Sequence, residues 1–251
     1  MTVLAKEPEQ RPFPRESLAV ITGAGSGIGR AIVLELIHRK VPCCLIGRTM
    51  SKLEEIARSA REAGVECIPK AVDLGAPEAG TVLGEEIRAS GRPVHLLVHS
   101  AGAIRRSLLE ESTVAEFEAL LAVNLVAPYA LTKALLPLLH ASKGQVVFVN
   151  SSVVHYPAAG VVQYAATKHA LKGLADGLRQ EVNARGIRVL SVYPGQTATP
   201  LQQSLYAAQG RPYKPENLLQ PEDVARALVQ AIAMPYTAEI TDLMIRPAVK
   251  G

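Results

Sequence analysis

Two side chains at helical spacing could carry acid-base chemistry. Tyr164 and Lys168 stand four residues apart in the segment YAATK, so on a helix they share one face. A nearby ammonium group lowers the pKa of a phenol from about 10 towards neutrality, which suits a general acid or base. The same spacing also occurs on helix surfaces without any function, and the pattern alone leaves that alternative open.

A serine supplies a second polar group for such a site. Ser152 ends the apolar run 145–152, twelve residues before Tyr164. At the carboxyl end of a parallel strand, its hydroxyl would lie where α/β proteins bind ligands and could bond a substrate carbonyl oxygen beside the phenol. Ser151 is the alternative for this role.

A glycine-rich segment follows the first apolar run. Residues 22–29 read TGAGSGIG, with Gly23, Gly27 and Gly29 at points where a side chain would obstruct a phosphate or the packing of a helix on a sheet. The segment predicts that backbone N–H groups at a helix N-terminus hold the pyrophosphate of a dinucleotide. A flexible turn without a ligand is the alternative.

The second apolar run ends without an acidic residue. Gly47, Arg48 and Thr49 stand there, where NAD-binding chains carry a carboxylate for the ribose 2′-hydroxyl and an arginine accommodates a 2′-phosphate. We therefore predict that NADP(H) is preferred, with NAD(H) possible, although Arg48 could also be a solvated loop cation. Asp73, at the end of the third run, either binds the adenine amino group or caps a turn.

These residues need a scaffold of alternating strands and helices. We predict strands at 18–23, 43–47, 65–73, 94–102, 145–152, 187–195 and 239–247, and helices at 27–40, 51–64, 77–90, 113–140, 164–184 and 221–234. The helix 51–64 is expected to begin with Ser51 as N-cap and Glu54 in a capping box, and to stop at Gly64. Residues 196–220 contain three prolines and no clear period, so they are expected to form a long mobile connection.

The predicted fold class follows from this alternation. It is α/β, a doubly wound seven-stranded parallel sheet of the Rossmann type with helices on both faces. The length of 251 residues with 48% hydrophobic residues suits one cofactor-binding and catalytic domain over 18–251. Residues 1–17 are expected to be a disordered or loosely packed segment.

Composition also limits which partners the protein is expected to bind. The net charge of +4, from 27 basic and 23 acidic residues, argues against a nucleic-acid partner. Three cysteines form no even disulfide set and no metal-binding spacing, so we expect reduced thiols, a cytoplasmic location and no metal. With no uninterrupted run of 18 apolar residues, no membrane span is predicted.

With these motifs in order, residues 18–247 resemble the single-domain branch of the short-chain dehydrogenase/reductase family. The motifs that carry the resemblance are TGAGSGIG at 22–29, Asp73, HSAG at 99–102, Asn124, the serines 151–152, YAATK at 164–168, and PG at 194–195 with a threonine downstream. The resemblance implies a carbonyl reductase or alcohol dehydrogenase that transfers a hydride between NADP(H) and a small-molecule carbonyl or alcohol.

Roles for individual residues follow from the same resemblance. Tyr164 would protonate the carbonyl oxygen, Lys168 would bind the nicotinamide ribose, Ser152 would position the carbonyl, and Asn124 would hold a proton-relay water. The implied cofactor site comprises Gly23, Gly25, Ser26, Gly27, Ile28, Gly29, Arg48, Asp73, Leu74, Ala101, Gly102, Tyr164, Lys168, Pro194, Gly195 and Thr197. The implied substrate contacts are Ser152, Val154 and Tyr164.

The chain departs from the family pattern after the fourth strand. His99 and Ser100 stand where the family usually has two asparagines, and we expect His99 to support the core. Arg105 and Arg106 either grip an acidic substrate or are surface cations.

Two further expectations concern the whole chain. The resemblance implies a homodimer or homotetramer formed through the helices 113–140 and 164–184. A non-catalytic NADP-sensing or scaffolding protein remains the alternative function. Such a protein would be free to lose Tyr164, Lys168 or Ser152, and all three are present.

Overall fold

Seven short strands form one parallel sheet. The computed structural model describes residues 17–248, so the expectation for 1–17 lies outside the described residues except for Ser17, which is buried. The strands are β1 (Leu18–Thr22), β2 (Cys43–Gly47), β3 (Cys67–Ala71), β4 (Val94–His99), β5 (Gln145–Val149), β6 (Arg188–Pro194) and β7 (Asp242–Ile245). They lie in the order β3-β2-β1-β4-β5-β6-β7. The predicted fold class is confirmed.

Strand order explains why the apolar runs show no in-out alternation. The central strands β1, β4, β5 and β6 are buried along their whole length, because helices cover both faces of a parallel sheet. The edge strands β3 and β7 are only partly buried. Every strand lies within its predicted range.

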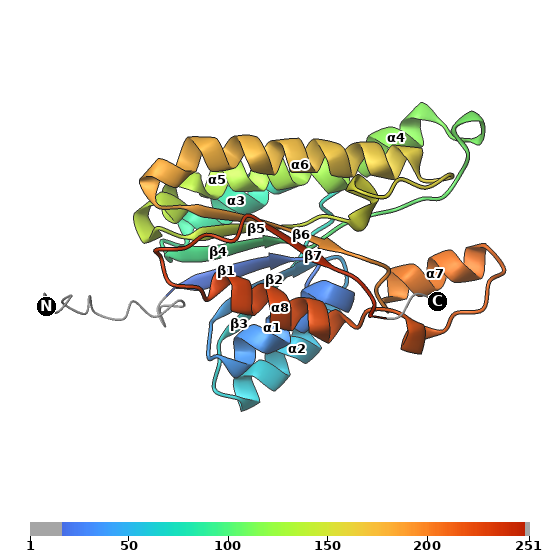
Figure 1. Cartoon of the computed structure of the whole chain (residues 1–251). Helices are drawn as coiled ribbons and strands as arrows, with labels where there is room; N and C mark the ends of the chain where they lie inside the picture. Colours follow the sequence, from blue (N-terminus) through green and yellow to red (C-terminus); the bar gives the residue numbers. More distant parts are fainter. Residues whose placement is uncertain (1–16, 249–251) are drawn as a thin grey trace, which may run out of the picture.

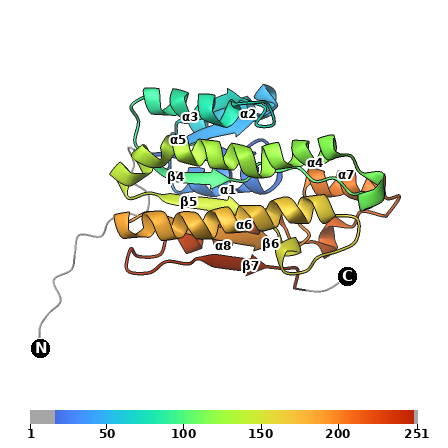
Figure 2. The ribbon, with the colours of Figure 1, turned by 90° about the horizontal axis from the view of Figure 1, so that it is seen from above.

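Helices form a layer on each face of the sheet (Figure 1). On one face lie α1 (Gly27–His38), α2 (Met50–Glu62) and α8 (Pro221–Ile232); on the other lie α3 (Ala79–Ala89), α4 (Val114–Leu121), α5 (Ala127–Ser142) and α6 (Val162–Val182). Seen from above, α3, α5 and α6 run side by side across the sheet (Figure 2). The two faces enclose separate hydrophobic clusters.

The start of α2 differs from the prediction. The helix begins at Met50 with Thr49 as N-cap and has no side-chain cap, so the capping box of Ser51 and Glu54 is wrong. The chain turns into the helix two residues after β2 ends, which places both Ser51 and Glu54 inside the first turns and exposed to solvent. The stop is as predicted, since Gly64 follows the helix with a φ of +69°.

The predicted helix 113–140 is interrupted. A π-helical turn, Ala122–Val126, separates α4 from α5 and carries Asn124. Taken together, Val114–Ser142 is long and apolar enough to cross a membrane by length and composition. However, Leu131, Leu135 and Leu139 are buried in the core between α5 and the sheet, so packing within this chain uses the inner face of α5.

The predicted irregular connection 196–220 contains a helix. Residues Pro200–Ala208 form α7, which begins where the Thr199 side chain accepts a hydrogen bond from Gln202 N. Pro200 occupies the first turn of the helix, where its missing N–H costs nothing. In Figure 1, α7 lies beyond the end of β6, away from both helical layers.

Candidate active site

The glycine turn joins β1 to α1 and packs closely against the loop that follows β4. A Cβ on Gly23, whose φ is +69°, would stand 2.8 Å from Ala101 N, and one on Gly29 would stand 2.2 Å from Gly23 O. Neither position accommodates a side chain. The turn therefore brings bare backbone and the N-terminus of α1 to one point, which is an arrangement that binds phosphate.

A threonine holds the loop after β4 over this turn. Thr22 Oγ1 accepts hydrogen bonds from Ser100 N and Ala101 N, both at 3.1 Å. The threonine is itself buried. Two strand ends are thereby joined at the carboxyl edge of the sheet.

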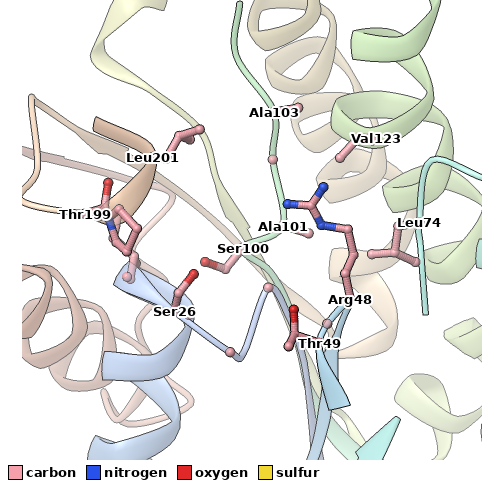
Figure 3. A pocket seen from close by; sticks show the side chains of 18 of the residues that line it. Ser26, Arg48, Thr49, Leu74, Ser100, Ala101, Ala103, Val123, Thr199 and Leu201 are labelled. Carbon is pink, nitrogen blue, oxygen red and sulfur yellow. The ribbon is translucent and has the colours of Figure 1, made fainter. Parts of the chain in front are cut away.

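A cavity of about 470 Å³ opens at this edge (Figure 3). It is lined by eleven of the predicted cofactor residues: Gly23, Gly25, Ser26, Gly27, Ile28, Gly29, Arg48, Asp73, Leu74, Ala101 and Gly102. The guanidinium of Arg48 extends across the cavity towards Ala101 and Val123 (Figure 3). Among the lining residues, Lys52 adds a second cation and Asp73 is the one acid.

Asp73 was predicted either to bind the adenine amino group or to cap a turn, and in the structure it caps a turn. Its Oδ1 atom accepts a hydrogen bond from Gly75 N at 3.0 Å. The residue also lines the cavity, so the two alternatives are compatible.

Part of the cavity wall comes from residues outside the predicted cofactor set. Thr199, Pro200, Leu201 and Ser204 line it from the start of α7. The Thr-Pro pair at 199–200 is a helix-start signal that would have placed α7. By contrast, five predicted cofactor residues are not among the lining residues: Tyr164, Lys168, Pro194, Gly195 and Thr197.

The geometry around Thr197 explains this difference. Thr197 is buried, and its hydroxyl donates to Gly195 O at 2.9 Å. Gly195 N in turn donates to Ile245 O at 2.7 Å. The second of these bonds ties the end of β6 to β7, and Thr199 lines the cavity.

Lys168 lies beside Tyr164, next to Gly102 of the cavity wall, and neither Tyr164 nor Lys168 is itself among the lining residues. Its Nζ atom is 5.8 Å from the centre of the Tyr164 ring and donates to Val149 O at 3.1 Å. A Cβ placed on Gly102, which lines the cavity, would be 3.8 Å from the same Nζ atom. Burial lowers the pKa of Lys168 from 10.5 to about 8.

The pKa of Tyr164 moves opposite to the expected direction. Desolvation by the surrounding protein raises this pKa above 10, and a hydrogen bond with Ser151 offsets only part of the rise. The expectation of a lowered phenol pKa is wrong in this structure, because desolvation outweighs the lowering effects. The phenol is therefore protonated at neutral pH.

The serine bonded to Tyr164 is Ser151, not Ser152. β5 ends at Val149, so Ser151 is still extended (φ −159°), and a 3₁₀ turn begins at Ser152. Ser151 Oγ also accepts a hydrogen bond from Val153 N at 3.2 Å. The sequence assignment placed the strand end too late, and the structure brings Ser151, the alternative of the two serines, to the phenol.

Asn124 is fully engaged in hydrogen bonds within the protein. Its Oδ1 accepts from Ala103 N, and its Nδ2 donates to Ala103 O, both at 2.8 Å. The second Nδ2 hydrogen goes to Thr167 Oγ1 at 3.0 Å, and the Thr167 hydroxyl donates to Tyr164 O at 2.8 Å. The loop after β4, the π turn and α6 are thus connected through Asn124 and Thr167.

His99 supports the core, as expected. Its Nε2 lies 2.8 Å from Thr132 Oγ1, and its ring stacks on Phe148. Complete burial lowers the pKa of His99 to about 3, so the imidazole is neutral at physiological pH. Arg105, the first of the two arginines, pairs with Glu116 at 2.8 Å as a surface cation.

Comparisons with known proteins agree with this geometry. A family model described as short chain dehydrogenase matches residues 17–210. An uncharacterized oxidoreductase of Staphylococcus saprophyticus is 29% identical over 235 residues, 93% of this chain and 98% of that protein.

Two solved structures share the fold. An alcohol dehydrogenase from the archaeon Thermococcus sibiricus, complexed with 5-hydroxy-NADP, is 28% identical with a TM-score of 0.83, covering 94% of this chain and 98% of that one. A metagenomic short-chain oxidoreductase in complex with NADP is also 28% identical, with a TM-score of 0.80 and coverage of 95% and 100%.

Proposed function

Because this chain belongs to the short-chain dehydrogenase family, we propose that it is an NADP(H)-dependent carbonyl reductase or alcohol dehydrogenase with Tyr164 as the general acid and base. The observation that carries the proposal is the position of Tyr164. It lies over Lys168, whose Nζ atom is close to Gly102 of the cavity wall, and its phenol is hydrogen-bonded by Ser151.

The cavity residues suit a dinucleotide phosphate. The glycine turn leaves no room for a Cβ at Gly23 or Gly29, so backbone N–H groups and the start of α1 can approach a pyrophosphate. Arg48 and Lys52 supply two cations for a 2′-phosphate, which agrees with the NADP in the two solved relatives.

When bound, the reduced nicotinamide supplies a hydride to a carbonyl carbon. Tyr164 gives its phenolic proton to the carbonyl oxygen, and the raised pKa keeps that proton in place beforehand. Ser151 bonds the phenol oxygen and is close enough to position the same carbonyl. The buried ammonium of Lys168 stabilises negative charge that develops on the phenol.

The proposed substrate contacts lie outside the sheet, at a turn after β5 and at the start of α7. Val154 follows Ser151 in the 3₁₀ turn, and Leu201 reaches the cavity from α7. Both are apolar, which favours a moderately bulky ketone or alcohol. We propose no narrower substrate class.

Replacing Tyr164 tests the mechanism. Tyr164→Phe removes the proton donor and keeps the ring, so we expect NADPH binding to persist while turnover falls by at least 10³-fold, near the upper part of the range for general acid catalysis. Fluorescence of bound NADPH and its oxidation with a panel of ketones measure the two properties. Full activity in this variant would end the proposal, as would a wild-type protein that binds NADPH but oxidises it with no carbonyl compound.

Replacing Arg48 tests the cofactor. Loss of a cation that pairs with the 2′-phosphate should raise the KM for NADPH by roughly tenfold or more, about 1.4 kcal/mol or more, and leave the KM for NADH nearly unchanged. Arg58→Ala on the exposed side of α2 is the matched control and should change neither value. A wild-type preference for NADH would contradict the assignment.

A further inference from the structure

Two of the three cysteines face each other far from the proposed active site. Cys43 and Cys67 are the first residues of β2 and β3 and are direct register partners. Neighbouring strands lie about 4.7–4.9 Å apart, and disulfides join Cα atoms that are about 4.4–6.8 Å apart. The backbone spacing therefore permits a bond between these two residues.

The side chains of the pair lie on the same face of the sheet. Cys43 is completely buried in the cluster beneath α1 and α2, and Cys67 packs against that cluster. Cys44, the next residue in β2, belongs to the cluster on the opposite face, because side chains alternate along a strand. Cys44 therefore cannot replace Cys43 as the partner of Cys67.

The two thiols affect each other's pKa. Interaction with Cys67 and burial raise the pKa of Cys43, and Cys43 Sγ lies 3.3 Å from Val41 O. Hydrogen bonds from the Cys43 thiol and backbone lower the pKa of Cys67, whereas burial raises the pKa of Cys44 to about 11. Thiolate reactivity follows pKa and exposure, so Cys67 is the reactive member of the three.

Position in the sheet also gives Cys67 access and freedom. It is partly exposed, while Cys43 and Cys44 are buried. β3 is an edge strand that pairs with β2 alone, so its first residue can move towards β2 without breaking contact with another strand. A disulfide requires Cβ atoms about 3.5–4.5 Å apart.

We propose that Cys43 and Cys67 form a reversible disulfide when the protein meets a hydroperoxide. The Cys67 thiolate attacks the peroxide oxygen, which breaks the O–O bond and leaves a sulfenic acid on Cys67 and one water after protonation. The Cys43 sulfur then attacks the Cys67 sulfur, and the hydroxyl leaves as a second water. Overall, two thiols are oxidised and one hydrogen peroxide is reduced, and a dithiol reductant reverses the change.

Peptide mapping of the folded wild-type protein tests the proposal. After treatment with a small excess of hydrogen peroxide and blocking of free thiols, non-reducing tryptic digestion should link peptide 41–48, VPCCLIGR, to peptide 62–70, EAGVECIPK. The intact mass should fall by two hydrogen atoms, and the number of free thiols should fall from three to one. Dithiothreitol should restore all three.

Variants identify the partner, because peptide 41–48 contains both Cys43 and Cys44. Cys44→Ala should leave the cross-link unchanged, whereas Cys43→Ala and Cys67→Ala should abolish it. Circular dichroism checks that each variant is folded. The wild-type map is decisive even if one variant does not fold, since fragmentation of the linked peptide distinguishes Cys43 from Cys44.

Three results would overturn the proposal. Cys67 could advance to the sulfinic acid without a link to Cys43, the link could involve Cys44, or all three thiols could remain free until the protein is unfolded. Each of these outcomes means that Cys43 and Cys67 do not form a disulfide with each other in the folded protein.

Discussion

At the scale of single residues, the candidate site differs from the sequence prediction in two ways: Ser151 rather than Ser152 interacts with Tyr164, and the pKa of Tyr164 is raised rather than lowered. The spacing of Tyr164 and Lys168 predicted their proximity, and they are adjacent. The spacing could not predict that burial raises the pKa of Tyr164 and lowers that of Lys168 to about 8, because desolvation depends on atoms contributed by distant segments. The proposed acid therefore starts in its protonated form.

Replacing each of the two adjacent serines by alanine should change kcat by very different amounts. Ser151→Ala removes the hydroxyl that bonds Tyr164, so kcat should fall by about 10²-fold or more with little change in NADPH binding. Ser152→Ala removes a hydroxyl from the start of the 3₁₀ turn and should lower kcat by less than about threefold. Steady-state kinetics on one ketone checks both variants.

The serine result discriminates between two assignments. A large loss in Ser152→Ala with a near-normal Ser151→Ala would return the catalytic role to Ser152. Similar thermal unfolding of the two variants is the control, because each serine is only partly buried.

At the scale of elements, the order of strands and helices was predictable, and the irregular turns were not. Buried parallel strands and amphipathic helices have clear periods, and every predicted strand and helix is present. The π turn at Asn124 is stabilised by bonds to Ala103 and Thr167, which are 21 and 43 residues away in the chain. No local pattern contains that information.

Thr167 is expected to position the catalytic elements. Thr167→Val keeps the side-chain shape but leaves Asn124 Nδ2 and Tyr164 O without this partner, which costs about 1–3 kcal/mol. We expect kcat to fall by roughly tenfold with a smaller change in the KM for NADPH. Thr167→Ser keeps the hydroxyl and should recover most of the activity.

A comparison of the two substitutions separates positioning from packing. Thr167 is completely buried, so Thr167→Ser creates the larger packing defect and Thr167→Val the larger hydrogen-bonding defect. If Thr167→Ser were the less active of the two, packing would dominate and the positioning role would be wrong.

At the scale of the whole molecule, one helical face lacks a partner within the described chain. Val126, the last residue of the π turn, and Tyr129 in α5 are 56% and 52% exposed, while the opposite face of α5 is in the core. Figure 2 shows α5 and α6 side by side on the outer surface. We propose that this face forms the dimer or tetramer contact expected from the sequence.

Charge on this face should weaken association. Val126→Lys would bury an ammonium in the contact, so we expect dissociation to increase by at least tenfold, about 1.4 kcal/mol. Val82→Lys on α3, where the valine is 51% exposed, is the matched control and should leave the assembly intact. Sedimentation velocity measures both variants, and a monomeric wild type would refute the proposed contact.

The sequence by itself determined the alternating order of elements, the glycine turn and the positions of Tyr164 and Lys168, because each depends on neighbours within a few residues. Tertiary structure alone decided that Ser151 bonds Tyr164, that Thr199 faces the cavity, and that Cys43 faces Cys67. These outcomes depend on the residue at which a strand ends and on the register between strands. A shift of one residue turns a side chain to the opposite face, and only the packing of the complete sheet selects one register.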